Sequence, residues 1–311
     1  MNKNLTVGLL LGLAALAVGV ITYYNYTLPP LEQSERPVVA ATIFPIYDIA
    51  RHVAGDTTDV KLLLPPGASP HTFEPTPTTL KELRDAAVLY AVGHGADDWA
   101  AELLAGTGTP IVVVDAHVTL REIKDDEAEH EHETEETDTD HEHEGTDPHY
   151  WLSIQNAKHI AANIADDLVT RNPDLAAEVR ANLQKYLAEL DLAAADITAT
   201  LDGIENRRIV TLHDAWYYFA EENDLEIVAS FEPSPGREPT PQYLAALGHA
   251  VSTNDVRAIY SEPQLSTTTL LPFTEDHGIA IAILDPLGGI DGRDSYIVTM
   301  IYNAETIAQN Q

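Results

Sequence analysis

Five side chains that can bind a metal ion each follow an apolar run of the sequence. His71 lies in PPGASPHTFEP after VKLLL, His149 in DPHYW after IVVVD and a long insertion, and His213 in TLHDAW after RIVTL. Glu262 follows VRAIY, and Asp285 follows IAIAIL. Imidazole nitrogens and carboxylate oxygens are zinc ligands, and four of them complete a tetrahedral site. The three histidines and Asp285 would make such a set, with Glu262 as a carboxylate that orients a ligating imidazole.

The position of these three histidines sets them apart from the others. A single histidine is more often a surface or hydrogen-bonded residue than a ligand. Ligands gather, however, where the strands of parallel sheets end, and all three follow an apolar run. His94 lies in a glycine turn after another such run, and its role stays open. We interpret the following histidines as surface or hydrogen-bonded residues: His52, His117, His159, His249 and His277.

Apolar runs alternate with helical patterns from Val38 onward. This alternation predicts parallel sheets covered by helices on both faces. We expect an α/β fold of two lobes, at 38–172 and 204–311, each a four-stranded parallel sheet flanked by helices. One long rigid helix within 173–203 is expected to join them, because Asn172-Pro173 breaks the preceding helical pattern. The expected strands are 38–44, 60–64, 87–92, 111–115, 208–212, 226–230, 256–260 and 279–284.

The segment 1–26 carries an apolar stretch of 17 residues between Leu5 and Ile21. That length lies at the boundary between a signal peptide and a membrane-spanning helix. The tyrosines that follow are typical of a membrane interface and favour an uncleaved anchor over a cleaved signal. Either interpretation exports the rest of the chain, with 27–37 as a proline-stiffened linker. The sequence has no cysteine, which excludes disulfides, thiolate ligands and a lipidated cysteine anchor.

The run 125–147, DDEAEHEHETEETDTDHEHEGTD, contains 13 acidic residues and no basic one. It is too polar to fold by itself, and such runs are usually only solvated. The alternative is a mobile loop that collects zinc with low affinity through four imidazoles. Those imidazoles belong to His130, His132, His141 and His143. His149 is assigned to the folded side of this boundary, because Pro148 fixes its backbone and Tyr150 and Trp151 are expected to pack.

The overall composition restricts the class of partner. The chain has 50 acidic against 17 basic residues and a formal net charge of −33, and 44% of its residues are hydrophobic. The hydrophobic content is typical of a folded globular protein. Phosphate is repelled by so acidic a surface, so nucleic acid is excluded as a partner. Cations are instead the partners that an acidic surface attracts. An acidic surface also suits a protein in saline media, and the sequence leaves both explanations open.

Five motifs in order, PPGASPHTFEPTP, DPHYWLS, TLHDAWYYFA, SEPQ and LDPLGG, closely resemble the periplasmic zinc and manganese solute-binding proteins of ABC transporters. The resemblance covers about residues 38–310. It implies that the three histidines and Asp285 bind one metal ion between two lobes. Manganese-preferring relatives often carry glutamate at the position of His213, so imidazole there favours Zn²⁺ over Mn²⁺. Zinc-uptake relatives also tend to carry a histidine- and acid-rich insertion before the second ligand, as here.

The function implied by the resemblance is that of an extracytoplasmic, monomeric metal-binding subunit of a high-affinity ABC import system. It would deliver zinc to a membrane permease and its ATPase, and it would not be an enzyme. The alternatives are a manganese-specific binding protein, an adhesin-like metal buffer and, least favoured, a zinc hydrolase. A hydrolase would need three ligands, a bound water and a base such as Glu262 or Glu74. The sequence has no H-E-x-x-H motif to support it.

Overall fold

Two four-stranded parallel sheets form the framework of the computed structural model, which describes residues 36–83, 86–123, 145–232 and 240–311. In the first sheet the strands lie in the order β2-β1-β3-β4. Its central strands β1 and β3 are almost entirely buried, which explains why they are apolar without a break. The elements of this lobe are β1 Val38–Ala41, α2 Phe44–Ala54, β2 Asp59–Leu62, α3 Pro77–Leu83, β3 Ala86–Ala91, α4 Trp99–Leu104 and β4 Ile111–Val113.

The second sheet repeats this arrangement, with the strand order β10-β9-β7-β8. Its first strand, β7, lies between its second and third strands, as β1 does in the first lobe. All described pairings in both sheets are parallel. The elements are β7 Arg208–His213, α7 Tyr217–Glu222, β8 Glu226–Glu232, α8 Pro241–Thr253, β9 Ala258–Ser261, α9 Leu271–His277, β10 Ala280–Ile283 and α10 Tyr296–Gln309. The predicted fold class, with its two parallel sheets, is therefore confirmed.

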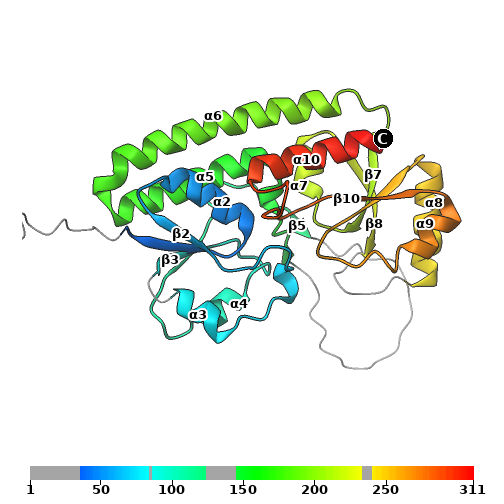
Figure 1. Ribbon diagram of the computed structural model, residues 1–311. Helices are drawn as coiled ribbons and strands as arrows, with labels where there is room; N and C mark the ends of the chain where they lie inside the picture. The colour runs from blue at the N-terminus through cyan, green and yellow to red at the C-terminus, as the bar shows by residue number, and fades with distance from the viewer. Residues whose placement is uncertain (1–35, 84–85, 124–144, 233–239) are drawn as a thin grey trace, which may run out of the picture. The chain divides into compact units, whose positions relative to one another are not determined.

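A long helix, α6 (Ala176–Leu201), joins the lobes and appears as the long green helix along the upper edge of Figure 1. It follows α5 (Ile154–Arg171) after a short 3₁₀ turn at Pro173–Leu175. The helix packs against α5 and α2 of the first lobe and against α10 of the second. Its buried residues recur at helical spacing, so they form one face: Val179, Tyr186, Leu190, Ala193, Ile197 and Leu201.

Two short strands bracket the acidic run. β5 (Glu122–Ile123) pairs antiparallel with β6 (Gly145–Thr146), and Asp147 after them is buried. The expected loop 125–147 is therefore wrong at its C-terminal end, because its last three residues belong to the folded part. The segment 1–26 and most of the linker 27–37 lie outside the described residues. The four predicted collector histidines also lie outside them: His130, His132, His141 and His143.

No helix within the described ranges has both the length and the apolar character needed to cross a membrane.

Small differences at element boundaries have a simple physical origin. The first strand was expected to reach Phe44, but it ends at Ala41 and Phe44 begins α2. An apolar run that continues from a buried strand into the buried face of a helix shows no change of pattern where the strand ends.

Candidate metal centre

The three predicted histidines lie together, although they come from three separate segments. His71 is in a 3₁₀ turn, Pro70–Thr72, after β2, and His149 directly precedes another, Tyr150–Leu152. His213 is the last residue of β7. One ring nitrogen from each lies within 4.8 Å of the other two. The Nε2 atoms of His71 and His149 are 3.4 Å apart, close to the roughly 3.3 Å that separates two nitrogens bound tetrahedrally at zinc.

A buried carboxylate holds the ring of His149. Oδ1 of Asp147 lies 2.9 Å from Nδ1 of His149 and also accepts the backbone N–H of the same residue at 3.0 Å. An imidazole that donates from Nδ1 keeps the lone pair of Nε2 free, and Nε2 is the atom that faces the cluster. Sequence reasoning missed this role, because it counted Asp147 with the acidic run. The only local signal was its place directly before Pro148 and His149.

A second buried carboxylate holds the ring of His213. Oε1 of Glu262 lies 3.1 Å from Nδ1 of His213 and accepts a hydrogen bond from Nε1 of Trp216 at 3.1 Å. Glu262 comes directly after β9, so the end of a neighbouring strand presents it to the end of β7. This contact is the one expected of a carboxylate that orients a ligating imidazole.

The imidazoles of His71 and His213 differ in their affinity for protons. Loss of solvent around the His71 ring, together with the neighbouring rings of His149 and His213, lowers the pKa of His71 to about 4, even though part of this residue is exposed. Burial also acts to lower the pKa of His213. The hydrogen bond and negative charge of Glu262 outweigh burial, and the pKa of His213 is raised above its ordinary value.

Asp285 is buried at the end of β10 but does not join the group of three histidines. Its Oδ1 accepts the backbone N–H groups of Leu287 (3.0 Å) and Gly288 (2.9 Å). Its Oδ2 lies 3.0 Å from Nε of Arg293, an ion pair without hydrogen-bond alignment. Among the described residues, Oδ2 has no hydrogen-bond partner. The role of Asp285 as a fourth ligand stays a prediction.

A cavity of about 350 Å³ opens at the cluster. The three histidines line it together with apolar side chains from both lobes, among them Trp151, Leu265 and Leu287. Nitrogen donors that converge in this cleft favour zinc, because imidazole is a ligand that suits zinc. The apolar lining of the cleft lowers the local dielectric constant and so strengthens each electrostatic contact.

Comparison with known protein families matches residues 39–310 to ZnuA, the zinc-uptake complex component A, periplasmic. The chain belongs to the ZnuA family. The resemblance stated from the motifs is therefore confirmed. The family is described as a component of zinc uptake, which speaks against the hydrolase alternative.

Individual relatives include proteins named for each of the two metals. The chain is 27% identical over 286 residues to the zinc-binding protein AdcA of Streptococcus pyogenes serotype M3, covering 86% of this chain and 55% of AdcA. It is 27% identical over 281 residues to the manganese-binding lipoprotein MntA of Halalkalibacterium halodurans, covering 88% of each. A crystal structure of ZnuA superposes with a TM-score of 0.76 at 26% identity, covering 89% of this chain and 99% of that one. The chain thus spans about half the length of AdcA.

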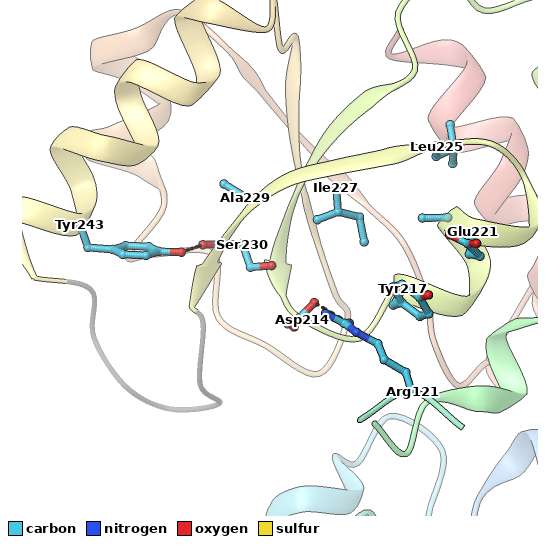
Figure 2. A pocket seen from close by; sticks show the side chains of 10 residues that line it. Arg121, Asp214, Tyr217, Glu221, Leu225, Ile227, Ala229, Ser230 and Tyr243 are labelled. Atoms are coloured by element: carbon cyan, nitrogen blue, oxygen red, sulfur yellow. Dashed lines mark hydrogen bonds and ion pairs between the residues drawn. The ribbon is translucent and has the colours of Figure 1, made fainter. Parts of the chain in front are cut away.

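This ZnuA-family chain has a second cavity, of about 390 Å³. It lies beside Asp147, the carboxylate that holds the ring of His149. Arg121 lines it, and its Nη1 lies 3.4 Å from Oδ2 of the buried Asp147. Figure 2 shows the guanidinium directed toward Asp214 and next to the ring of Tyr217, which lies 4.3 Å from it. Arg121 therefore neutralises the carboxylate that holds His149, in a cavity separate from the cleft of the three histidines.

The remaining histidine of interest, His94, lies outside the group of three. Its Nε2 is 2.8 Å from Oδ2 of Asp115, and its backbone has a φ of 54° between two glycines that also have positive φ. The hydrogen bond to Asp115 offers a reason for this conformation without a metal. The structure thus accounts for His94 as part of the loop that follows β3.

Proposed function

We propose that this chain is the extracytoplasmic metal-binding subunit of an ABC import system, which captures zinc between its two lobes and delivers it to a membrane permease. The observation that carries the proposal is the convergence of three imidazoles from both lobes, with Nε2 of His71 and Nε2 of His149 at 3.4 Å. Carboxylates hold the rings of His149 and His213 through Nδ1 and leave Nε2 free, as the partners of metal-bound histidines do.

Zinc is the favoured cargo and manganese the alternative. The grouped donors are all nitrogen, and nitrogen donors select zinc, whereas manganese prefers oxygen. AdcA, a relative of this chain, is named for zinc and MntA for manganese, so the family alone does not decide the metal. We propose His71, His149 and His213 as ligands, Asp285 as the fourth ligand, and Glu262 and Asp147 as the groups that orient the rings.

The site is built for small movements during capture and release. Nε1 of Trp151 in the first lobe donates to the carbonyl of Pro286 in the second at 2.8 Å, and the hydroxyl of Tyr296 donates to the carbonyl of Trp151 at 2.7 Å. These buried bonds, with α6 packed along both lobes, oppose a wide hinge opening. Of the three grouped histidines only His71 is exposed, so we propose that release begins at its turn.

Delivery requires a location outside the cytoplasm and a membrane partner. We propose that the segment 1–26 exports the chain and anchors it, that a permease and its ATPase receive the metal, and that the chain acts as a monomer. The four histidines of the acidic run are proposed as a low-affinity collector. An adhesin-like metal buffer is the second candidate, and it would bind zinc equally well without a permease.

Replacement of His213 tests the site. The variant His213→Ala should bind zinc several orders of magnitude more weakly, since a structural zinc site contributes on the order of 10 kcal/mol. The readout is competition calorimetry with a chelator, together with the bound metal content. The exposed His159 on α5 provides the matched control, because His159→Ala should keep the wild-type affinity. Unchanged zinc content and affinity in His213→Ala would refute the proposed site.

A further inference from the structure

The position of Asp285 is fixed by its neighbours. Its backbone N–H donates to Oδ1 of Asn303 and its carbonyl accepts from Nδ2 of the same residue, both at 2.8 Å. Two backbone N–H groups of the DPLGG turn occupy Oδ1. The side chain is fully buried. Oδ2 is therefore the carboxylate oxygen that makes no hydrogen bond within the described part of the chain.

Arg293 places a positive charge against this oxygen. Its Nε is 3.0 Å from Oδ2, and only 14% of its side chain is exposed. The guanidinium also lies over the ring of Tyr302, 4.4 Å from the ring centre, which restrains it from the side of α10. Neither Nε nor Oδ2 makes an aligned hydrogen bond within the described part of the chain, so the contact is electrostatic. A metal ion that uses Oδ2 must compete with this charge.

This competition weighs differently on the two candidate metals. Zinc is satisfied by imidazole, and three imidazoles already converge at the site. Manganese prefers oxygen ligands, so it depends more on Asp285. We propose that Arg293 sets the preference for zinc over manganese by restraining Asp285 as an oxygen ligand. The proposal rests on the proposed function, because it presumes that the three histidines bind the metal.

The test compares the two metals on the full chain with Arg293→Met, which keeps an unbranched side chain and removes the charge. The ratio of manganese to zinc dissociation constants, measured by competition calorimetry, should fall by about tenfold or more, the lower end of the roughly 10–100-fold effects seen when groups behind metal ligands change. The ratio is the readout because both metals gain from the loss of a nearby positive charge. Co²⁺ bound in place of zinc should show altered visible absorption, which reports ligand geometry.

Three further variants define the mechanism. Arg293→Lys keeps the charge and should keep a ratio near that of the wild type, whereas the exposed Arg180→Met on α6 should change nothing. In the double variant Arg293→Met with Asp285→Asn the gain for manganese should disappear, since Arg293 acts through Asp285. Should Arg293→Met not fold, as judged by circular dichroism, Arg293→Gln takes its place.

The outcomes separate this proposal from the proposed function. An unchanged metal ratio in a folded, uncharged variant that still binds zinc through His213 would overturn the role of Arg293 alone. A gain for manganese that persists in the double variant would overturn it as well. Absence of zinc binding that depends on His213 in the unaltered chain would instead remove the proposed function, before any Arg293 variant is compared.

Discussion

The surroundings of the cluster make the imidazoles of His71 and His213 unequal in their affinity for protons. Glu262 raises the pKa of His213 against the effect of burial, while the pKa of His71 is lowered to about 4. A proton and a metal ion compete for the same nitrogen. The imidazole with the raised pKa is therefore the first of these two to take up a proton as the pH falls.

We expect zinc affinity to decline as the pH falls through the raised pKa of His213, above the ordinary histidine value of about 6.5. Competition at His71 adds to the decline only near pH 4. Replacing Glu262 by Gln removes the charge that raises the pKa of His213, so the first decline should move to lower pH. Calorimetry between about pH 5 and pH 8 measures this. An affinity that does not change with pH would contradict a site made of histidines.

Residue types and their order predicted that the three histidines would lie together, and the structure brings them together. Glu262 was expected to orient an imidazole, but the support of His149 could not be predicted in the same way. Asp147 looked like the end of a solvated run, and its burial depends on the pairing of β5 with β6. The contact between Arg293 and Asp285 arises only when the DPLGG turn and the following loop fold back on each other. Such contacts leave no periodic signal in the sequence.

At the scale of elements, the alternation of strands and helices was sufficient to predict both sheets, because a buried parallel strand is apolar throughout. Element ends were predicted less well. The joining helix was expected within 173–203, and α6 begins at Ala176 only after a 3₁₀ turn. Both conformations begin readily at a proline, so Pro173 marks the start of a helical segment without deciding which kind.

Two leucines of α6 provide a matched test of what the joining helix contributes. Leu190 is fully buried, while Leu192, two residues later, is 68% exposed. Leu190→Ala should lower the free energy of unfolding by about 2–5 kcal/mol, and Leu192→Ala by less than about 0.5 kcal/mol. Urea denaturation of the metal-free protein gives both values. Equal effects of the two substitutions would show that the buried face of α6 does not stabilise the fold.

At the scale of the whole molecule, the two lobes have the same strand order, and the grouped histidines come from both of them. The proposed site therefore depends on both lobes, and within the described part of the chain the acidic run is joined to it through β5 and β6. This separation leads to a prediction about the run as a unit.

Deletion of residues 126–144 should leave the single tight zinc site unchanged and remove only weak additional binding. The deletion leaves two residues, Lys124 and Asp125, between Ile123 and Gly145, the shortest common connection for an antiparallel pair. Calorimetry should show the same dissociation constant for the tight site and a lower total stoichiometry. A variant with glycine and serine in place of 126–144 separates the loss of histidines from the shortening. Loss of the tight site in both variants would assign the run to the site itself.

The pairing of β5 with β6 has a practical consequence for protein engineering. The two short strands hold both ends of any insertion next to each other and directly before the support of His149. For a flexible insertion, each doubling of length adds only about 0.6 kcal/mol to the cost of closing it. A fluorescent domain spliced between these strands would consequently be carried beside the cleft at little cost in stability, which makes this position the natural place to build a sensor of free zinc.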